Sequence, residues 1–340
     1  MLTLKKGVNL GGFLSQCSEY TTEHYETFIT KEDIKNIKDM RFDHIRLPID
    51  YEVLETEEGE ALPHNYHFVD DTLEWCKEYG LNVLLDVHKT WGYFFDNAGK
   101  NEDLNTLFDS EEAIDRFLGL WELLSSRYGK YSDFVGMELL NEVVNPEYAE
   151  PWNKLIRRAV AVIRKNAPDT TIVYGGVEWN SAGTLKLLEE PFDDNVINTF
   201  HYYEPLLFTH QKAPWVPTIS QTMDVPYTDD MEWFKKESAK IGMQGMAVVN
   251  SKASRMGVEF HEETIKCALD VAKERGLVLY CGEFGVIDRA DPAEAIKWYK
   301  DVLDLFAKYD IGYALWSYKE MDFGIMGEKY GELRDFLTNR

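Results

Sequence analysis

Eight short apolar runs, separated by segments with helical periodicity, are the feature that most constrains the fold of this 340-residue chain. The runs cover residues 7–13, 44–49, 82–88, 134–142, 171–176, 196–203, 277–285 and 313–319. Near-continuous apolar strands are typical of a parallel sheet that is covered on both faces. Eight strand–helix repeats with right-handed crossovers predict an α/β fold, a closed (β/α)8 TIM barrel. A doubly wound open sheet is the alternative, although the first run lacks a G-x-G-x-x-G phosphate loop.

The segments between the runs carry recognisable helix ends. Thr30 and Ser110 stand before acidic residues as N-caps, and Asp291 precedes a proline that can occupy the first helical position. Gly80 and Gly276 can close two further helices. These signals predict helices that begin near residues 31, 111 and 292, and others that end at 80 and 276.

One interval, between the runs at 196–203 and 277–285, is much longer than the others. The excess falls on residues 205–257, which contain four prolines and one predicted helix over 229–241. Because this segment follows a strand, it should emerge at the C-terminal face of the barrel, where active sites lie in this architecture. We interpret residues 1–340 as a single catalytic barrel domain and 205–257 as an inserted subdomain, too short for a core of its own.

The charge of the chain restricts its partners. Lysine and arginine number 36 against 60 aspartate and glutamate, a formal net charge of −24. Such a field repels nucleic acid and anionic lipid surfaces, and no apolar run is long enough to span a bilayer. We expect a monomer with neither metal nor other cofactor. Residues 1–7 lack a secretory apolar stretch, so we expect either a cytoplasmic protein or one whose leader has been removed.

Polar and aromatic residues stand at the C-terminal ends of the runs, where a barrel gathers its active site. They are Asn9, Arg46, His88, Asn141, Glu142, His201, Tyr203, Glu283 and Trp316. Buried polar groups are costly without a function, so together they indicate one site. Taken singly, Arg46 could form a structural ion pair, and His88 could be a core histidine satisfied by Asp86. A metal site at Asp86 and His88 is disfavoured, because it would want more ligands.

Two of these residues are glutamates that end strands on different sides of the predicted barrel. Glu142 and Glu283 should therefore face each other across its mouth, as paired carboxyl groups do around a glycosidic bond. We predict that Arg46 and Tyr203 hold Glu283 ionised as the nucleophile. Glu142 then protonates the leaving oxygen and later activates water. Asn141 could bind the sugar hydroxyl next to the anomeric carbon.

The run ends also carry a family resemblance. The motifs are Gly7-Val-Asn-Leu-Gly-Gly12, Ile45-Arg-Leu-Pro48, Leu85-Asp-Val-His88, Leu140-Asn-Glu142, His201-Tyr-Tyr203, Gly282-Glu-Phe-Gly285 and Leu315-Trp316. Together they resemble glycoside hydrolase family 5, retaining (β/α)8 enzymes of the cellulase and mannanase group. The match is strongest to the compact endoglucanase C type, which has an inserted subdomain after strand six and a sequence like residues 208–215.

The resemblance implies roles for individual residues. Glu142 would be the acid/base and Glu283 the nucleophile, and Trp316 would form the floor of the subsite for the cleaved sugar. The supporting residues would be Arg46, His88, Asn141, His201 and Tyr203. One departure is Lys89, where many relatives have a second histidine, so the sugar contacts beside it can differ from the family pattern.

Aromatic residues in the strand-to-helix loops are the expected sugar platforms, because pyranose faces present C–H groups that stack on rings. The candidates are Trp91, Tyr93, Trp179, Tyr202, Trp215 and Trp316. The alternative for each is that the ring packs its own loop, and this alternative is weakest for Trp215 and Trp316.

These features together predict a retaining endo-β-1,4-glucanase, a cellulase that acts on β-1,4 or mixed-linkage β-glucans by double displacement. A β-mannanase, a xyloglucanase or an exo-β-glucosidase of the same family is the alternative within the enzyme class. A non-catalytic carbohydrate-binding barrel is the alternative from another class, but such a protein has no need of two opposed carboxyl groups.

Overall fold

The computed structural model describes residues 1–98 and 100–340 and contains a closed barrel of eight parallel strands. The strands follow one another in chain order, and β1 also pairs with β8. They are β1 (Lys6–Asn9), β2 (His44–Asp50), β3 (Asn82–Lys89), β4 (Val135–Glu138), β5 (Ile172–Gly175), β6 (Val196–Tyr202), β7 (Leu279–Phe284) and β8 (Gly312–Leu315). The predicted (β/α)8 barrel is confirmed, and the open sheet is wrong.

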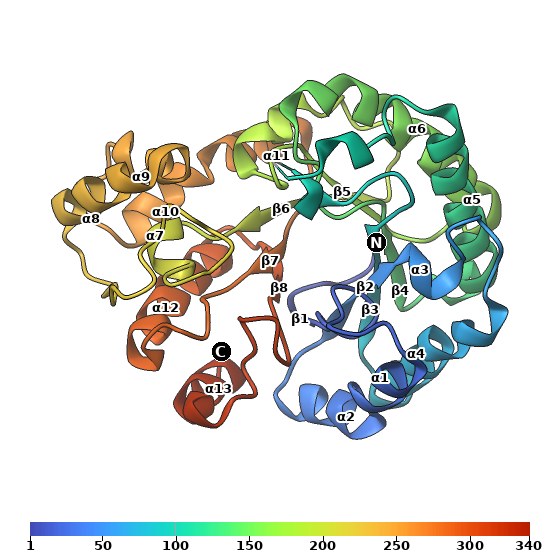
Figure 1. Cartoon of the computed structure of the whole chain (residues 1–340), viewed down its shortest axis with the longest axis horizontal. Coiled ribbons are helices and arrows are strands. Elements are labelled where there is room, and N and C mark those ends of the chain that lie inside the picture. The colour runs from blue at the N-terminus through green and yellow to red at the C-terminus, as the bar shows by residue number, and fades with distance from the viewer. Residues whose placement is uncertain (99) are drawn as a thin grey trace.

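Helices surround the barrel, as Figure 1 shows. The α-helices are α1 (Thr22–Thr27), α2 (Lys31–Asp39), α3 (Tyr51–Leu54), α4 (Tyr66–Tyr79), α5 (Glu111–Tyr128), α6 (Ala149–Asn166), α7 (Leu206–Thr209), α8 (Met231–Ser238), α9 (Met246–Val249), α10 (Val258–Thr264), α11 (Lys266–Arg275), α12 (Pro292–Lys308) and α13 (Gly331–Thr338). Short 3₁₀ helices are η1 (Pro63–Asn65), η2 (Phe95–Asn97), η3 (Glu102–Leu104), η4 (Gly129–Tyr131), η5 (Pro146–Tyr148), η6 (Ala182–Leu187), η7 (Ala239–Gly245) and η8 (Glu328–Tyr330). Among the helices in the described ranges, none combines the length and the apolar character needed to cross a membrane.

The helix ends lie where the sequence predicts them. The side chains of Thr30, Ser110 and Asp291 accept hydrogen bonds from backbone N–H groups in the first turns of α2, α5 and α12. Gly80 and Gly276 follow α4 and α11 with φ values of 68° and 66°, a left-handed conformation that glycine adopts at low cost. Local capping chemistry therefore defines these helices before any packing.

Side chains alternate between the two faces of each strand, and this alternation fills the barrel. Leu84 and Tyr280 belong to a small buried apolar cluster separate from the larger one, which holds their strand neighbours Val83 and Cys281. Nearer the C-terminal strand ends, the buried side chains become polar. The interior of the barrel is therefore apolar in one part and polar near the C-terminal strand ends. We call this polar part the chamber.

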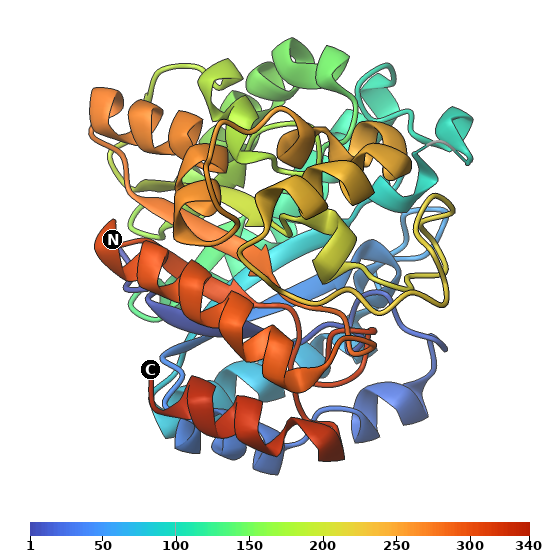
Figure 2. The ribbon, with the colours of Figure 1, turned by 90° about the vertical axis from the view of Figure 1, so that its left-hand side faces the viewer.

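The segment between β6 and β7 contains α7 to α11. The helix predicted over 229–241 is present as α8, which continues into η7. Figure 1 shows α8 and α9 at the left of the molecule. In Figure 2 both termini lie at the left, and the yellow loop around residues 210–225 reaches to the right. Because β1 begins next to the N-terminus, this loop extends toward the C-terminal end of the strands.

Candidate active site

A single buried guanidinium organises the polar chamber. Arg46, on β2, donates from Nε and Nη2 to the two carboxylate oxygens of Glu138, at 2.7 and 2.9 Å. Its Nη2 also lies 3.0 Å from Asp86 Oδ2, and its Nη1 donates to Glu283 Oε1 at 2.8 Å. Burial disfavours the charged form of Arg46, but the three carboxyl groups outweigh burial and raise its pKa. Arg46 therefore forms a buried ion pair with Glu138 and also contacts Glu283.

Glu283, on β7, has a donor for each carboxylate oxygen. Arg46 Nη1 lies 2.8 Å from Oε1, and the Tyr203 hydroxyl donates to Oε2 at 3.0 Å. Tyr203 follows β6, which pairs with β7, so the fold itself brings this hydroxyl to the carboxyl group. The predicted contacts of Arg46 and Tyr203 with Glu283 are therefore present, and each is a hydrogen bond that a carboxylate oxygen can accept.

Glu142 lies in a different environment. Although its run was predicted as one strand over 134–142, β4 ends at Glu138, and Glu142 stands in the following loop. Its Oε1 lies 2.7 Å from His201 Nδ1 on β6. Burial raises the pKa of Glu142 to about 7 and lowers the pKa of His201 to about 4. Near neutral pH the pair is therefore a neutral imidazole beside a carboxyl group that holds its proton easily.

The two glutamates and His201 converge. One oxygen of Glu142, one oxygen of Glu283 and a ring nitrogen of His201 all lie within 4.8 Å of one another. Groups of this kind can also hold a metal ion. Here His201 Nδ1 lies within hydrogen-bond distance of Glu142 Oε1, and Arg46 Nη1 donates to Glu283 Oε1.

Asn9 and Asn141 complete the inner part of the chamber. Asn9 Oδ1 accepts from Arg46 Nη1 at 3.0 Å, and Asn141 Oδ1 accepts from Arg46 Nη2 at 2.9 Å. The Asn141 amide nitrogen is buried and has no hydrogen-bond partner. An unpaired buried donor is costly, so this nitrogen is the group in the chamber most in need of a ligand oxygen.

His88 and Trp316 lie against each other. Their rings are stacked at 5.6 Å with an interplanar angle of 10°. His88 Nδ1 lies 2.7 Å from Asp86 Oδ2, so the alternative of a histidine satisfied by Asp86 is correct as far as this contact goes. The neighbouring Lys89 bonds to Glu52. The family departure at Lys89 therefore places a paired charge, rather than a free one, beside the chamber.

The aromatic candidates separate into two groups. Trp179 and Trp215 are exposed by 51% and 40%, which leaves ring area open for a ligand. Tyr93 is buried and bridges the loop that carries Glu142, because its hydroxyl donates to Glu142 O at 3.0 Å and accepts from Val144 N at 2.8 Å. As a sugar platform, Tyr93 is wrong.

Tyr202 is also wrong as a platform. It is buried, and its hydroxyl lies 2.6 Å from His261 Nδ1 on α10. Trp91 packs against other segments, because its indole N–H donates to Glu57 at 2.9 Å and the guanidinium of Arg116, on α5, lies 4.5 Å from its ring. Tyr93, Tyr202 and Trp91 therefore make packing contacts to other segments of the protein.

Two residues of the chamber were not predicted from the sequence. Glu138 is a charged residue inside an apolar run, which is a signal that a buried cation must pair with it. Asn180 follows β5 and donates from Nδ2 to the Asn141 carbonyl oxygen at 2.9 Å. A polar residue just after a strand was again the available signal.

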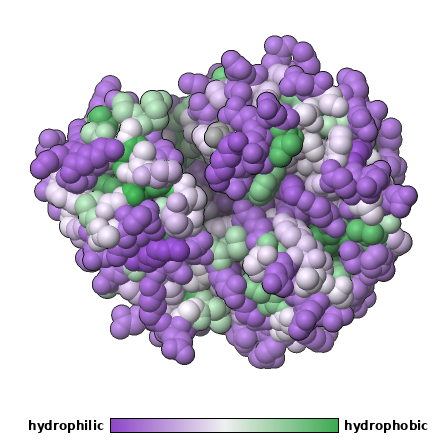
Figure 3. Space-filling model, in the orientation of Figure 1, coloured by the Kyte–Doolittle hydropathy of each residue, from purple (hydrophilic) through white to green (hydrophobic). Residues whose placement is uncertain are grey.

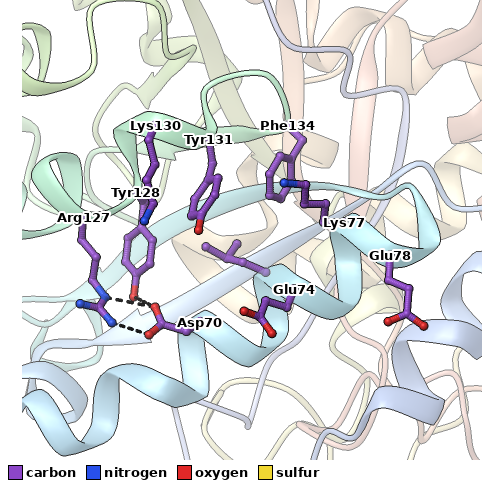
Figure 4. Close-up of a pocket in the computed structure, with 10 residues that line it drawn as sticks. Asp70, Glu74, Lys77, Glu78, Arg127, Tyr128, Lys130, Tyr131 and Phe134 are labelled. Atoms are coloured by element: carbon purple, nitrogen blue, oxygen red, sulfur yellow. Dashed lines mark hydrogen bonds and ion pairs between the residues drawn. The ribbon is translucent and has the colours of Figure 1, made fainter.

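The surface of the molecule is hollowed at the C-terminal end of the barrel strands. Figure 3, in the orientation of Figure 1, shows a depression between the left-hand group of helices and the rest of the molecule. Another cavity, of about 500 Å³, lies between α4 and the end of α5. Figure 4 shows its polar rim, where Asp70 accepts from Arg127 and Tyr128. None of the predicted site residues lines this second cavity.

Comparisons with known proteins agree with this geometry. The family model described as "Cellulase (glycosyl hydrolase family 5)" matches residues 5–322. Endoglucanase C of Acetivibrio thermocellus is 38% identical over all of this chain and 98% of its own length. Cellodextrinase A of Ruminococcus flavefaciens is 37% identical over 90% of this chain and 83% of its own length.

Solved structures share the fold. Thermotoga maritima Cel5A with cellobiose has a TM-score of 0.74 and 27% identity, over 98% of this chain and 97% of the other. Its complex with mannotriose has a TM-score of 0.72 and 27% identity, over 99% of this chain and 96% of the other. A family match that spans nearly the whole chain, on a barrel in which two glutamates converge, leads to one conclusion: the chain belongs to glycosyl hydrolase family 5, the cellulase family, and is a glycoside hydrolase.

Proposed function

We propose that the enzyme is a retaining endo-β-1,4-glucanase that uses Glu142 and Glu283 on β-1,4 or mixed-linkage β-glucans. The observation that carries the proposal is the approach of the two carboxyl groups, since one oxygen of Glu142 lies within 4.8 Å of one oxygen of Glu283. Retaining glycosidases hold their carboxyl groups about 5–5.5 Å apart, whereas inverting enzymes need about 6.5–9.5 Å to admit a water molecule. The spacing favours direct attack by one carboxylate.

In the proposed first step, Glu283 attacks the anomeric carbon. The bond from this carbon to the leaving oxygen breaks while a bond to the carboxylate forms, and Glu142 gives its proton to the leaving oxygen. In the second step Glu142 takes a proton from water, and the hydroxide displaces Glu283. The different surroundings of the two carboxyl groups support this division of roles: Glu283 accepts from the Arg46 guanidinium and the Tyr203 hydroxyl, whereas Glu142 is buried beside the neutral His201 ring.

Substrate contacts are proposed for the residues around this pair. The unpaired Asn141 amide nitrogen would donate to the hydroxyl beside the anomeric carbon. Trp316 would form the floor of the subsite, and the exposed rings of Trp179 and Trp215 would extend the binding surface. Arg46, His88, His201 and Tyr203 would act by holding these groups in place.

The relatives favour glucan as the substrate, because two of them are named endoglucanase and cellodextrinase. A mannan remains the nearest rival, since a structure of similar fold holds mannotriose. We further propose that the enzyme is a monomeric single domain with residues 205–257 as its inserted subdomain. In support, Val216 and Phe234 of this segment belong to the same apolar cluster as the barrel helices.

A substrate panel tests the proposed specificity. We expect rapid loss of viscosity of soluble cellulose and mixed-linkage glucan, with a mixture of short products, and much slower hydrolysis of mannan and xyloglucan. Chromatography of the early products distinguishes endo from exo cleavage. Release of glucose alone would indicate an exo-glucosidase, and preference for mannan would overturn the proposed substrate.

The pH dependence of the reaction should report the proton on Glu142. Because its pKa is raised to about 7, kcat/KM for cello-oligosaccharides should fall as the pH rises through about 7 and the acid loses its proton. A dinitrophenyl cellobioside has a leaving group that needs no proton, so it should lack this alkaline decline. The same decline with both substrates would assign it to another group, such as Asp86, whose burial also raises its pKa to about 7.

A further inference from the structure

The turn after β5 has an unusual backbone. Glu178, Trp179 and Asn180 have φ values of 53°, 55° and 52°, three successive non-glycine residues in the left-handed region. Such a conformation is costly for a residue with a side chain, so the surrounding structure must hold it in place. The result of this turn is that Trp179 is half exposed while Asn180 is buried.

Asn180 joins two parts of the chamber. Its Nδ2 donates to the Asn141 carbonyl oxygen at 2.9 Å and lies 3.4 Å from His201 Nε2. Its backbone oxygen accepts from His201 N at 2.9 Å. A carbonyl oxygen can only accept, so the contact with Asn141 fixes which end of the Asn180 amide carries the hydrogens.

This orientation determines the state of the histidine. The amide of Asn180 presents a hydrogen to His201 Nε2, so in the neutral ring this nitrogen accepts and the hydrogen resides on Nδ1. His201 Nδ1 then donates to Glu142 Oε1, which lies 2.7 Å away. With Oε1 occupied as an acceptor, the acidic proton of Glu142 belongs on Oε2.

The side-chain amide of Asn180 lies against Gly175. A Cβ atom on Gly175 would lie 2.4 Å from Asn180 Oδ1, so glycine at the end of β5 leaves room for this side chain. The backbone turn, the glycine and the buried amide therefore form one arrangement around His201.

We propose that Asn180 is a positioning residue that acts through His201, holding the tautomer with hydrogen on Nδ1 and directing the proton of Glu142 to Oε2. The catalytic part of the inference rests on the proposed role of Glu142. The tautomer does not depend on that role and can be measured separately.

Nitrogen NMR of protein with ¹⁵N-labelled histidine tests the tautomer. The chain has eight histidines, and the His201 signal is the one lost in H201N. We expect Nδ1 to be protonated and Nε2 bare. In N180D the carboxylate should accept at Nε2 and move the hydrogen there. Hydrogen on Nε2 in the unmodified enzyme, or no change in N180D, would overturn the proposal.

Kinetics test the consequence for catalysis. N180A should lower kcat/KM for cellotetraose by about 10- to 100-fold, part of the 10²–10⁴ that general acid catalysis supplies, and leave dinitrophenyl cellobioside within about twofold. Asn153 is the matched control, a buried asparagine whose Nδ2 donates to the carbonyls of Ala149 and Leu187. N153A should change neither substrate's kcat/KM. Equal losses on both substrates in N180A would contradict a positioning role.

The variant E142Q separates this inference from the proposed function. If E142Q has an equally reduced kcat/KM for cellotetraose and dinitrophenyl cellobioside, the acid role of Glu142 is wrong, whereas the NMR result for His201 stands. If E142Q has a reduced kcat/KM for cellotetraose alone, while N180A is as active as the unmodified enzyme, the acid role stands and the inference about Asn180 is wrong.

Discussion

Replacement of Glu283 by glutamine is expected to lower kcat by about 10⁴-fold or more on every substrate, the scale known for removal of an enzyme nucleophile. Glutamine keeps the size of the side chain but cannot form the covalent bond to the anomeric carbon. Its oxygen can still accept from Arg46 or Tyr203, so the fold and oligosaccharide binding should persist. Steady-state kinetics and calorimetric binding of cellotetraose measure the two effects.

The companion variant E142Q should behave differently. With cellotetraose the loss should be about 10²–10⁴-fold, because protonation of the leaving oxygen is removed. With dinitrophenyl cellobioside the first step should remain fast. E263Q is the matched control, since Glu263 caps the backbone of Lys252 and Ala253 away from the chamber. Near-normal activity of E283Q, or a similar pattern in E263Q, would disprove the assigned roles.

Replacement of Arg46 by methionine is expected to cost about 3–5 kcal/mol of unfolding free energy, the effect of removing one partner from a buried ion pair. The substitution leaves Glu138, Asp86 and Glu283 buried without their shared cation. Denaturant titration at pH 7 measures the loss. R157M is the control, because Arg157 pairs with Glu189 at the surface, where such pairs contribute about 0–1 kcal/mol.

The effect of R46M should depend on pH in a defined direction. Burial already raises the pKa of Asp86 to about 7 and raises the pKa of Glu138, and loss of the guanidinium should raise both further, so the folded variant should bind protons still more tightly relative to the unfolded chain. Its stability should therefore decrease as the pH rises from 5 to 7, and the deficit relative to the unmodified enzyme should be smaller at pH 5. A variant as stable as the original at pH 7 would show that the ion cluster contributes nothing to the fold.

The barrel could be predicted because each strand is a compact apolar run and each helix carries its own caps. The position of the glutamates followed from the same rule, since strand ends meet at one face. The exact end of β4 could not be read, because Leu139 and Leu140 continue the apolar run after the ladder has ended. Apolar character records burial, and loops at the centre of a barrel are buried too.

The prediction of Tyr202 as a sugar platform conflicts with the alternation of side chains along a strand. His201 and Tyr203 are two residues apart, so both face the chamber, and Tyr202 between them must face the helices. Tyr202 indeed bonds to His261 on α10. For Tyr93 no periodic signal was available, because it lies in a loop whose path depends on tertiary contacts. The left-handed turn that buries Asn180 was equally hidden, since none of its three residues is glycine.

Covalent trapping tests the central claim most directly. Dinitrophenyl 2-deoxy-2-fluoro-β-cellobioside should transfer its sugar to the enzyme with release of dinitrophenolate, and the fluorine should slow the attack of water, so that the ester accumulates. Mass spectrometry of the digested protein should then find one fluorosugar on Glu283. A fluorosugar on Glu142, or turnover with no covalent adduct and α-configured product, would contradict the account.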